Sequence, residues 1–405
     1  MIKSLLKKHI FKEAYVHKCS QTVYQSLMAA ISVYKIKRTS KSLELVNDIA
    51  LVLIDIQRPD GGYDIGYDFN FGKLHKKGES TSPELYAVVA LNLAYDVLIQ
   101  GGNEFEKSII LIKSSIIKSI AWIRSNAVRL SDDMYAIPYG PYSTHDIMVY
   151  NGVSFATGAL GTSLRFFKGS DLKELVSIYN GFNRYLLSNL MESEYGFVWY
   201  YNVQSRNDLD RKALNKIDFY HQAQQLEMHA IAQDYYPDGS QLEIIKMAAT
   251  TLINMSIYNK GNVPYTNDDI YFNGRYYLWG MSSLVPGLLK CVKYLPHLKL
   301  DIERSAKYVH AFISKYGINH KENMYFSVLS KDLKALNYPY MPRSDSWVVA
   351  SRLYYHEYFN TNDFNFEVSI LERIINCNYS GQENHAQNKR KKILIKIISI
   401  INKIK

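Results

Sequence analysis

The loop Gln57-Arg58-Pro59-Asp60-Gly61-Gly62-Tyr63-Asp64 lies between two helix-forming patterns, and the rest of the chain repeats this arrangement. Apolar periodicity predicts a helix over 41–57, immediately before the loop. Beyond the loop, Ser82-Pro83-Glu84 predicts a helix start, because serine is a favourable N-cap and proline fits the first turn. One unit therefore consists of a helix, a long loop rich in glycine and tyrosine, and a second helix.

The same periodicity predicts helices along the whole chain of 405 residues. The expected ranges are 20–36, 41–57, 84–98, 107–126, 150–167, 172–190, 219–233, 241–257, 279–294, 302–315, 346–358 and 365–376. Every second helix begins a repeat of roughly 60–70 residues, which is typical of stacked supersecondary units. Links within each pair are short, and links between pairs are long.

This spacing predicts an all-α fold, an (α/α)6 toroid of six helical hairpins. The long loops, with room for short β-hairpins, then emerge together on one rim. An open solenoid is the alternative architecture, because spacing alone does not establish closure. We expect residues 19–377 to form the toroid, 1–18 to be a basic N-terminal segment, and 378–405 to be a linker and a C-terminal helix.

The net charge of +10 belongs to the two ends of the chain. Residues 1–18 carry +4 and residues 389–405 carry +7, which leaves about −1 for 19–388. The body of the protein therefore lacks the basic surface that nucleic-acid binding requires, and we expect no nucleic-acid partner. The oligomeric state is left open by the sequence.

The C-terminal segment combines basic residues with isoleucines between 393 and 404. This pattern predicts a short basic amphipathic helix that binds an anionic membrane surface without spanning it. The alternative is a helix that docks on the body, or a terminus without structure. Lys7 and Lys8 interrupt the apolar run of a secretion signal, so we expect a cytoplasmic protein, peripheral on the inner face of the membrane.

Tyrosine is the most unusual feature of the composition, at 34 residues against 16 phenylalanines. Tyrosine rings stack on sugars while their hydroxyls exchange hydrogen bonds, although an AT-rich genome also enriches tyrosine. The three cysteines show no metal-ligand spacing, so we expect no metal site, no disulfide framework and no cofactor.

Polar and aromatic residues recur in each long loop and at the helix start that follows it. For a single loop, structural tyrosines and capping aspartates are the simpler interpretation, but five corresponding loops favour a binding cleft. The candidates are Tyr63, Asp64 and Tyr67; Tyr139, Tyr142 and His145; Trp199, Tyr201, Tyr220 and His221; Arg275 and Trp279; and Arg343, Asp345 and Trp347.

These loops resemble the (α/α) toroid superfamily of glycoside hydrolases, polysaccharide lyases and uronyl epimerases. Residues 57–230 are similar to the helical domain of glucuronyl carbon-5 epimerases, through the segments 57–63, 138–152 and 199–201 with 220–221. An arginine that this family places after its tyrosine strand has only an approximate match in Arg206. The Arg343-Ser344-Asp345-Ser346-Trp347 stretch instead resembles toroid proteins of bacterial exopolysaccharide biosynthesis.

The resemblance implies proton abstraction at carbon 5 of a uronic acid residue in an acidic polysaccharide or oligosaccharide. Tyr139 or Tyr142 would serve one ring face, and Tyr201 or Tyr220 the other, provided that nearby cations depress their pKa values. His145, His221, Arg275 and Arg343 would bind the carboxylate or the sugar. A lyase shares the first step and then eliminates the 4-linked sugar.

Two other classes fit the same loops. A glycoside hydrolase needs two carboxylates roughly 5–10 Å apart, and the sequence offers Asp60, Asp64, Asp146 and Asp345. A non-catalytic glycan-binding or scaffold subunit of a polysaccharide assembly system would use the same aromatic rim. Terpene and lanthionine cyclases also use helical toroids, but their acidic and zinc-binding motifs are not evident here.

Overall fold

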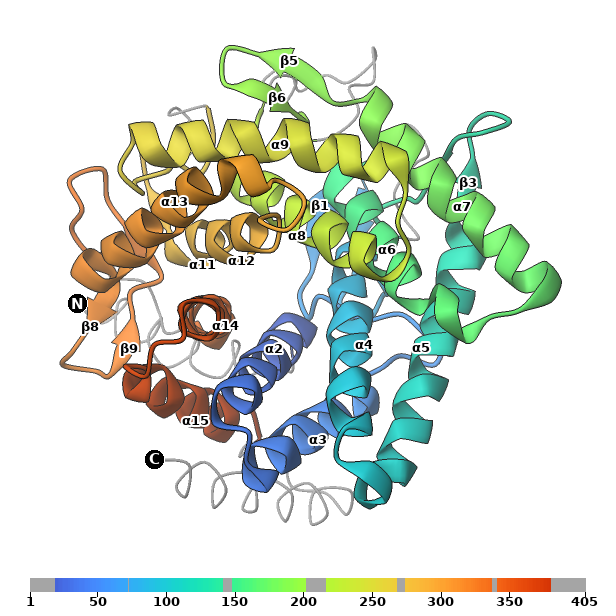
Figure 1. The fold of residues 1–405 in the computed structure, drawn as a ribbon, viewed down its shortest axis with the longest axis horizontal. Helices are drawn as coiled ribbons and strands as arrows, with labels where there is room; N and C mark the ends of the chain where they lie inside the picture. The colour runs from blue at the N-terminus through green and yellow to red at the C-terminus, as the bar shows by residue number, and fades with distance from the viewer. Residues whose placement is uncertain are drawn as a thin grey trace.

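Two concentric layers of helices form a ring around a central axis (Figure 1). A computed structural model describes residues 19–71, 73–140, 148–201, 216–267, 274–336 and 341–379. The inner layer contains α2 Ser20–Lys37, α4 Tyr86–Ile99, α6 Tyr150–Ser163, α8 Phe219–Tyr235, α11 Leu278–Ser282 with α12 Leu284–Leu289, and α14 Pro342–Phe359. The outer layer contains α3 Ser40–Asp55, α5 Glu106–Asn126, α7 Gly169–Ser188, α9 Gly239–Tyr258, α13 Lys299–Phe312 and α15 Asn365–Tyr379.

The helices of the two layers differ in how much of their surface is buried, as their sequences require. Every residue of α6 is buried, and its small residues allow neighbouring helices to approach closely. In contrast, α5 buries one face and exposes the other, because polar residues alternate with its buried isoleucines. Short 3-10 turns extend several helices: η1 Ser82–Leu85, η2 Gly102–Phe105, η3 Leu164–Phe166 and η4 Pro296–Leu298, while a π turn, Ile313–Gly317, follows α13.

The ring is closed, so the all-α (α/α)6 toroid prediction is confirmed. The last inner helix, α14, packs against the first, α2, where the ring of Trp347 meets the ring of Tyr24 edge-on at 6.1 Å. Glu357 of α14 accepts a hydrogen bond from Ser32 at 2.7 Å and pairs with Lys35 at 3.0 Å. These contacts join residues more than 300 positions apart and exclude the open solenoid.

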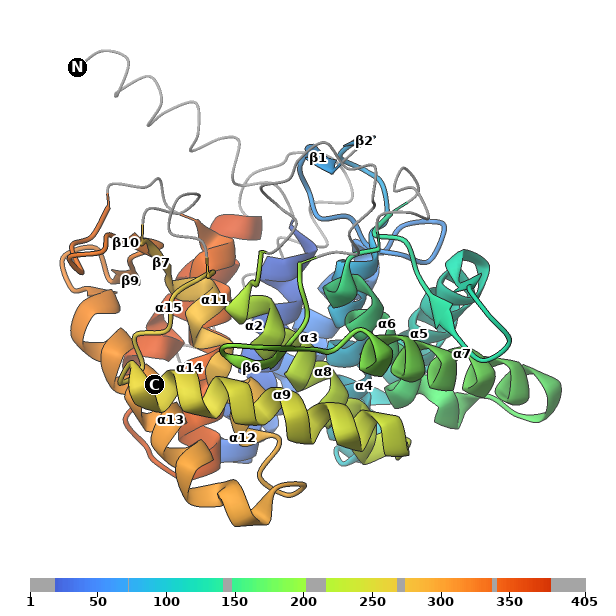
Figure 2. The same cartoon turned by 90° about the horizontal axis from the view of Figure 1, so that it is seen from above.

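Short antiparallel strand pairs lie in the long links between hairpins. They are β1 Phe69–Phe71 with β2 Lys73–His75, β3 Val128–Arg129 with β4 Tyr135–Ala136, β5 Met191–Ser193 with β6 Gly196–Val198, β7 Tyr276–Tyr277 with β10 Val328–Leu329, and β8 Ile318–Asn319 with β9 Met324–Tyr325. The pairing of β7 with β10 connects two successive loops. Figure 2 shows β1, β2, β7 and β10 on the same side of the ring, which we call the rim.

One inner helix differs from its predicted range. The sequence predicts a continuous helix over 279–294, but the structure breaks it at Ser283 into α11 and α12. Pro286 has no N–H to donate to the carbonyl of Ser282 four residues earlier. That carbonyl instead accepts a hydrogen bond from Ser351 of α14 at 2.5 Å, which ties the break to the neighbouring inner helix.

The segment Ser82–Ile99 is long and apolar enough to cross a membrane by length and composition. In the toroid it forms η1 and α4, and 78% of it is buried inside the protein. Its hydropathy therefore reflects the position of an inner helix in the core.

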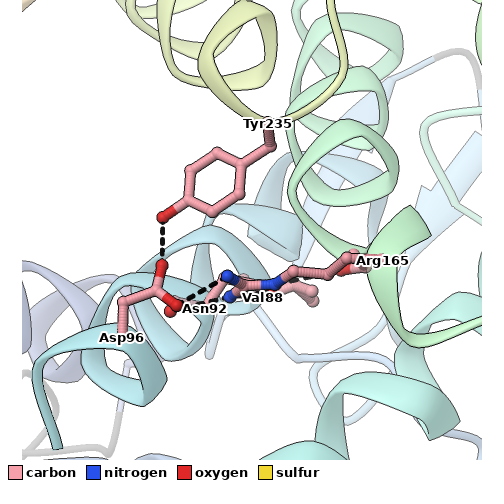
Figure 3. A network of polar contacts seen from close by, with 6 residues as sticks. Val88, Asn92, Asp96, Arg165 and Tyr235 are labelled. Carbon is pink, nitrogen blue, oxygen red and sulfur yellow. Dashed lines mark hydrogen bonds and ion pairs between the residues drawn. The ribbon is translucent and has the colours of Figure 1, made fainter. Parts of the chain in front are cut away.

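A polar network joins three inner helices at their C-terminal ends (Figure 3). These ends lie opposite the rim, because the inner helices begin at the rim. Arg165, just after α6, donates to Asp96 of α4 at 2.6 Å and to the side chain of Asn92 at 3.3 Å. The hydroxyl of Tyr235, in α8, also donates to Asp96, and its ring lies 4.8 Å from the Arg165 guanidinium. One cation thus holds the ends of α4, α6 and α8 together.

Replacing Arg165 by methionine is expected to lower the free energy of unfolding by about 1–3 kcal/mol, because Asp96 and Asn92 lose a charged donor. Urea denaturation measures this change. Arg129→Met is the matched control, because its partner Asp132 is fully exposed and such pairs contribute at most about 1 kcal/mol. Equal changes in the two variants would contradict the assignment of a structural role to Arg165.

Candidate active site on the rim

The rim ends of the inner helices bring together side chains from all parts of the chain. Tyr67 comes from the first long loop, Tyr139 from the second, Tyr201 from the third, and Arg343 from the first turn of α14. Tyr201, Tyr67, Glu84 and Arg343 all act electrostatically on Tyr139, so these groups lie within one small region. We refer to this cluster of side chains, together with His221 and Trp279, as the rim cleft.

Arg343 places a guanidinium group in the rim cleft. Its Nη1 donates to the Tyr67 hydroxyl at 2.9 Å, and its guanidinium lies 5.0 Å from the Trp279 ring. Burial opposes its charge, but Tyr67, Cys19 and Glu84 outweigh burial and raise the pKa of Arg343. Its Nε is buried and has no hydrogen-bond partner among the described residues. A planar cation with an unused N–H is suited to a carboxylate, which accepts two parallel hydrogen bonds from guanidinium.

Tyr139 and Tyr201 lie in the rim cleft as protonated phenols. The backbone carbonyl of Tyr139 accepts a hydrogen bond from the Ser82 N–H at 2.9 Å, which fixes this loop to the start of η1. Burial raises the pKa of Tyr139, and Arg343 opposes this only in part. Burial, with Asp218 and Tyr67, also raises the pKa of Tyr201. The expectation that cations depress these pKa values is wrong, because desolvation is the larger effect.

His221 provides a neutral imidazole beside Tyr201, at 5.5 Å between ring centroids. Its Nδ1 lies 3.1 Å from Oδ2 of Asp218, the fully buried N-cap of α8. Burial lowers the pKa of His221, although Asp218 opposes this shift. Lys216 lies over the ring of Tyr201, with Nζ 4.2 Å from the ring centroid. The cleft thus holds a proton acceptor beside proton donors.

Glu84 lies beneath the cleft and has no exposed surface. The hydroxyl of Ser20 and the amide of Gln21, at the start of α2, both donate to its carboxyl, the latter at 2.6 Å. Burial raises its pKa from 4.5 to about 7, against the opposing effects of these donors and of Arg343. The carboxyl therefore changes charge near neutral pH while supporting the first inner helix.

Glu84 is expected to make stability depend on pH. The pKa of Glu84 in the folded protein lies above its usual value, so the protonated carboxyl contributes to the free energy of unfolding. This contribution is fully present below pH 4.5 and is lost as pH rises through about 7. Glu84→Gln removes this dependence, so the variant gains roughly 3 kcal/mol relative to the parent between pH 4 and pH 8. Urea denaturation across this range measures the difference. Parallel curves of unfolding free energy against pH for the parent and Glu84→Gln would contradict this role of Glu84. Glu243→Gln, at an exposed position, serves as control.

Three candidates from the sequence belong to the hydrophobic core and are not part of the candidate site. Tyr220 is fully buried, its ring packs against Tyr265, and its hydroxyl donates to the carbonyl of Val263 at 3.1 Å. Tyr63 is fully buried with its hydroxyl 3.4 Å from Ser115 of α5. Trp199 is fully buried and donates from Nε1 to the carbonyl of Leu186 at 2.8 Å. Each points away from the cleft because the side chains of a helix start or strand project to more than one side.

Three other candidates stabilise the loops and helix starts around the rim cleft. Asp64 accepts hydrogen bonds from the N–H groups of Gly66 and Gly78, both at 2.8 Å, and so shapes its own loop. Asp345 is buried and accepts from the N–H of Tyr325 at 3.2 Å. Trp347 is 4% exposed and lies below Trp279, with ring centroids 6.2 Å apart.

Arg275 lies beside β7 and is partly buried. Tyr142, His145, Asp146 and Arg206 lie outside the described residues, as do residues 1–18 and 380–405.

The sequence interpretation missed Glu84, Lys216 and Cys19. Glu84 looked like an ordinary acidic residue in the first turn of a helix, and only the packing of α2 over it reveals its burial. Lys216 precedes a helix start, and Cys19 precedes α2, without any pattern that marks either residue. Their contribution depends on contacts between distant segments.

Comparison with known proteins places this geometry in a wider context. No protein-family model matches the chain, and no curated protein matches its sequence. Among solved structures, an unsaturated glucuronyl hydrolase specific for heparin matches with a TM-score of 0.57 and 12% identity, over 85% of this chain and 87% of that one. The chain has the (α/α)6-toroid fold.

Two further structures show the same arrangement. A family 105 glycoside hydrolase from C. acetobutylicum ATCC 824 matches with a TM-score of 0.56 and 15% identity, over 88% of this chain and 99% of that one. A sugar epimerase from a ruminal bacterium matches with a TM-score of 0.55 and 12% identity, over 84% and 89%. At these identities the likeness concerns the fold, and the chemistry of this toroid must be argued from its own residues.

Proposed function

We propose that this toroid acts on a uronic-acid-containing glycan by removing the proton at carbon 5. The observation that carries the proposal is the unused N–H of Arg343, buried beside Tyr67 and Trp279 and next to two protonated tyrosines and a neutral histidine. A guanidinium that binds the uronate carboxylate makes the neighbouring C–H more acidic, because it stabilises the negative charge that develops on the carboxylate oxygens.

The proposed reaction starts when the neutral imidazole of His221 accepts the carbon-5 proton. The C–H electron pair moves into the carboxyl group, and Arg343 stabilises the resulting enediolate. Tyr139 or Tyr201 then donates a proton to carbon 5 from the opposite ring face, which inverts the centre and gives an epimerase. If instead the enediolate electrons form a double bond between carbons 4 and 5, the bond from carbon 4 to its oxygen breaks, Tyr139 or Tyr201 gives its proton to the departing oxygen, and the protein is a lyase.

A glycoside hydrolase is the second candidate, favoured by the carboxyl of Glu84 and its pKa of about 7. Such a carboxyl is protonated often enough at neutral pH to act as a general acid. However, Glu84 has no exposed surface, and Asp60, Asp64 and Asp345 each accept hydrogen bonds within their own loops or at the start of α14. A hydrolase therefore requires a movement that exposes Glu84 and a second carboxylate partner.

Incubation with uronic-acid polysaccharides in heavy water tests these alternatives. Deuterium at carbon 5 without chain cleavage, followed by NMR, is expected for an epimerase, and an absorbing unsaturated end is expected for a lyase. New reducing ends without either signal would establish a hydrolase. If none of the three products forms on glycans that are shown to bind, catalysis is refuted and a glycan-binding subunit is the remaining function.

We also propose that the protein works in the cytoplasm, at the inner membrane surface, in the synthesis of a bacterial envelope, capsule or exopolysaccharide. Support comes from the basic amphipathic pattern of residues 389–405, which lie outside the described part of the chain. Flotation with anionic vesicles, compared with neutral vesicles and with a chain ending at 388, measures this association. Equal recovery of both chains would exclude membrane binding through this segment.

A further inference from the structure

Asp218, the N-cap of α8, uses its two carboxylate oxygens differently. Oδ1 accepts hydrogen bonds from the backbone N–H groups of Tyr220 at 3.1 Å and His221 at 3.0 Å, which is the ordinary role of an aspartate at a helix start. Oδ2 lies 3.1 Å from Nδ1 of the His221 imidazole. Capping therefore accounts for one oxygen, and the second is directed at the histidine of the rim cleft.

The backbone around Asp218 is fixed by the loop that follows α9. Asp218 pairs with Thr266 in an isolated β-bridge, and the N–H of Phe219 donates to the carbonyl of Tyr265 at 3.0 Å. The side chain of Asp218 has no exposed surface. The carboxylate is therefore held in place before a substrate arrives, as a group that orients a catalytic side chain must be.

The surroundings of this carboxylate determine which nitrogen of His221 carries the proton. The other groups that bind Asp218 are donors, namely the two backbone N–H groups and the hydroxyl of Tyr265. An unprotonated Nδ1 would direct its lone pair at a carboxylate oxygen, which is repulsive, whereas a protonated Nδ1 donates to that oxygen. The neutral ring therefore carries its proton on Nδ1, and Nε2 has the free lone pair.

Burial and charge assign Nε2 to the substrate side of the ring. Nδ1 is buried, so the 16% of the His221 side chain that is exposed belongs to its other atoms. Burial is the main cause that lowers the pKa of His221; Asp218 opposes it, and Lys216 and Arg343 add to it. Among these groups Asp218 alone carries a negative charge. It therefore offsets the two cations when the imidazole accepts a proton.

We propose that Asp218 is a positioning residue that holds His221 with Nε2 as the base of the rim cleft. This inference rests on the carbon-5 reaction proposed above. The Nε2 lone pair takes the carbon-5 proton while the C–H electron pair moves into the carboxyl group of the substrate. The resulting imidazolium keeps its Nδ1–H on Asp218, which is not itself protonated.

Nitrogen-15 NMR of the wild-type protein tests the tautomer without any substrate. The shift of each ring nitrogen reports whether that nitrogen carries a proton, and at about pH 8 the ring is neutral. We expect a protonated Nδ1 and an unprotonated Nε2, assigned by the loss of both signals in His221→Gln. A proton on Nε2 would overturn the proposal, whether or not the protein acts at carbon 5.

Asp218→Asn connects the tautomer to turnover. Asparagine is as good an N-cap as aspartate, and capping directs its oxygen at the two backbone N–H groups. Its NH2 group then donates to Nδ1, so the ring proton is expected to move to Nε2. The nitrogen-15 shifts should exchange, and kcat for deuterium incorporation at carbon 5 should fall by about 100–10,000-fold.

Asp238→Asn is the matched control, because Asp238 caps the outer helix α9 by accepting from the N–H of Gln241 at 3.0 Å. Its turnover is expected to equal that of the parent. A kcat for Asp218→Asn within threefold of the parent, or a loss of turnover with unchanged ring shifts, would contradict the role of Asp218. If the wild-type protein shows no carbon-5 exchange, the proposed reaction fails, whereas a wild-type Nε2–H tautomer contradicts the role of Asp218 alone.

Discussion

Arg343→Met is expected to lower kcat/KM on the uronic-acid glycan by about 100–1000-fold, a loss similar to that of a preorganised oxyanion donor. Methionine keeps much of the packing against Trp279 but removes every donor and the charge. Without the guanidinium between Tyr67 and Trp279, no cation at that position stabilises the negative charge of the developing enediolate. Initial rates of deuterium incorporation at carbon 5 measure the effect.

Arg343→Lys separates charge from geometry in the same assay. Lysine restores a positive charge but not the planar pair of N–H donors, so partial recovery, below one tenth of the parent rate, is expected. Arg165→Met is a control for general damage, because its network lies at the C-terminal ends of the inner helices, away from the rim. A kcat/KM for Arg343→Met within threefold of the parent would remove Arg343 from the reaction.

Tyr201→Phe is expected to reduce turnover by about 100–10,000-fold, the range that a positioned general acid contributes. The ring and its contacts with His221 and Lys216 remain, while the hydroxyl that donates the proton is lost. If Tyr139 is instead the donor, Tyr139→Phe shows the larger loss, and the comparison assigns the ring face. The rate of product formation at substrate saturation is the measurement.

Tyr220→Phe is the matched control for both tyrosine variants. Its hydroxyl donates to Val263 within the core, so we expect a loss of about 1 kcal/mol in stability and little change in turnover. Retention of full activity by both Tyr201→Phe and Tyr139→Phe would show that the rim tyrosines only stack on the sugar. A large loss of turnover in Tyr220→Phe, with stability preserved, would contradict its placement in the core.

Local sequence predicts the helices of this toroid well, because helix formation depends on short-range periodicity. The predicted ranges 20–36 and 107–126 correspond closely to α2 Ser20–Lys37 and α5 Glu106–Asn126. The exception, 279–294, contains Pro286, whose effect on the helix depends on whether a neighbour can satisfy the freed carbonyl. That neighbour is Ser351, 69 residues further along the chain.

The candidate site is predicted less completely, because side-chain direction is a tertiary property. Tyr139 and Tyr220 both lie near the rim ends of inner helices, yet only Tyr139 faces Arg343. A tyrosine beside a helix start has no local signal that distinguishes a cleft from the core. The charge states also follow from packing, since burial raises the pKa values of the rim tyrosines that were expected to fall.

The sequence by itself determined the all-α class, the six-hairpin repeat and the gathering of the long loops on one rim, because apolar spacing and loop length are local quantities. Tertiary structure decided that α14 closes the ring on α2, that Arg343 meets Tyr67 across 276 positions, and that Glu84 is buried beneath the cleft. Each of these depends on which distant segments come into contact and exclude water. Long-range packing therefore decides the chemistry of the rim, on a scaffold that local periodicity specifies.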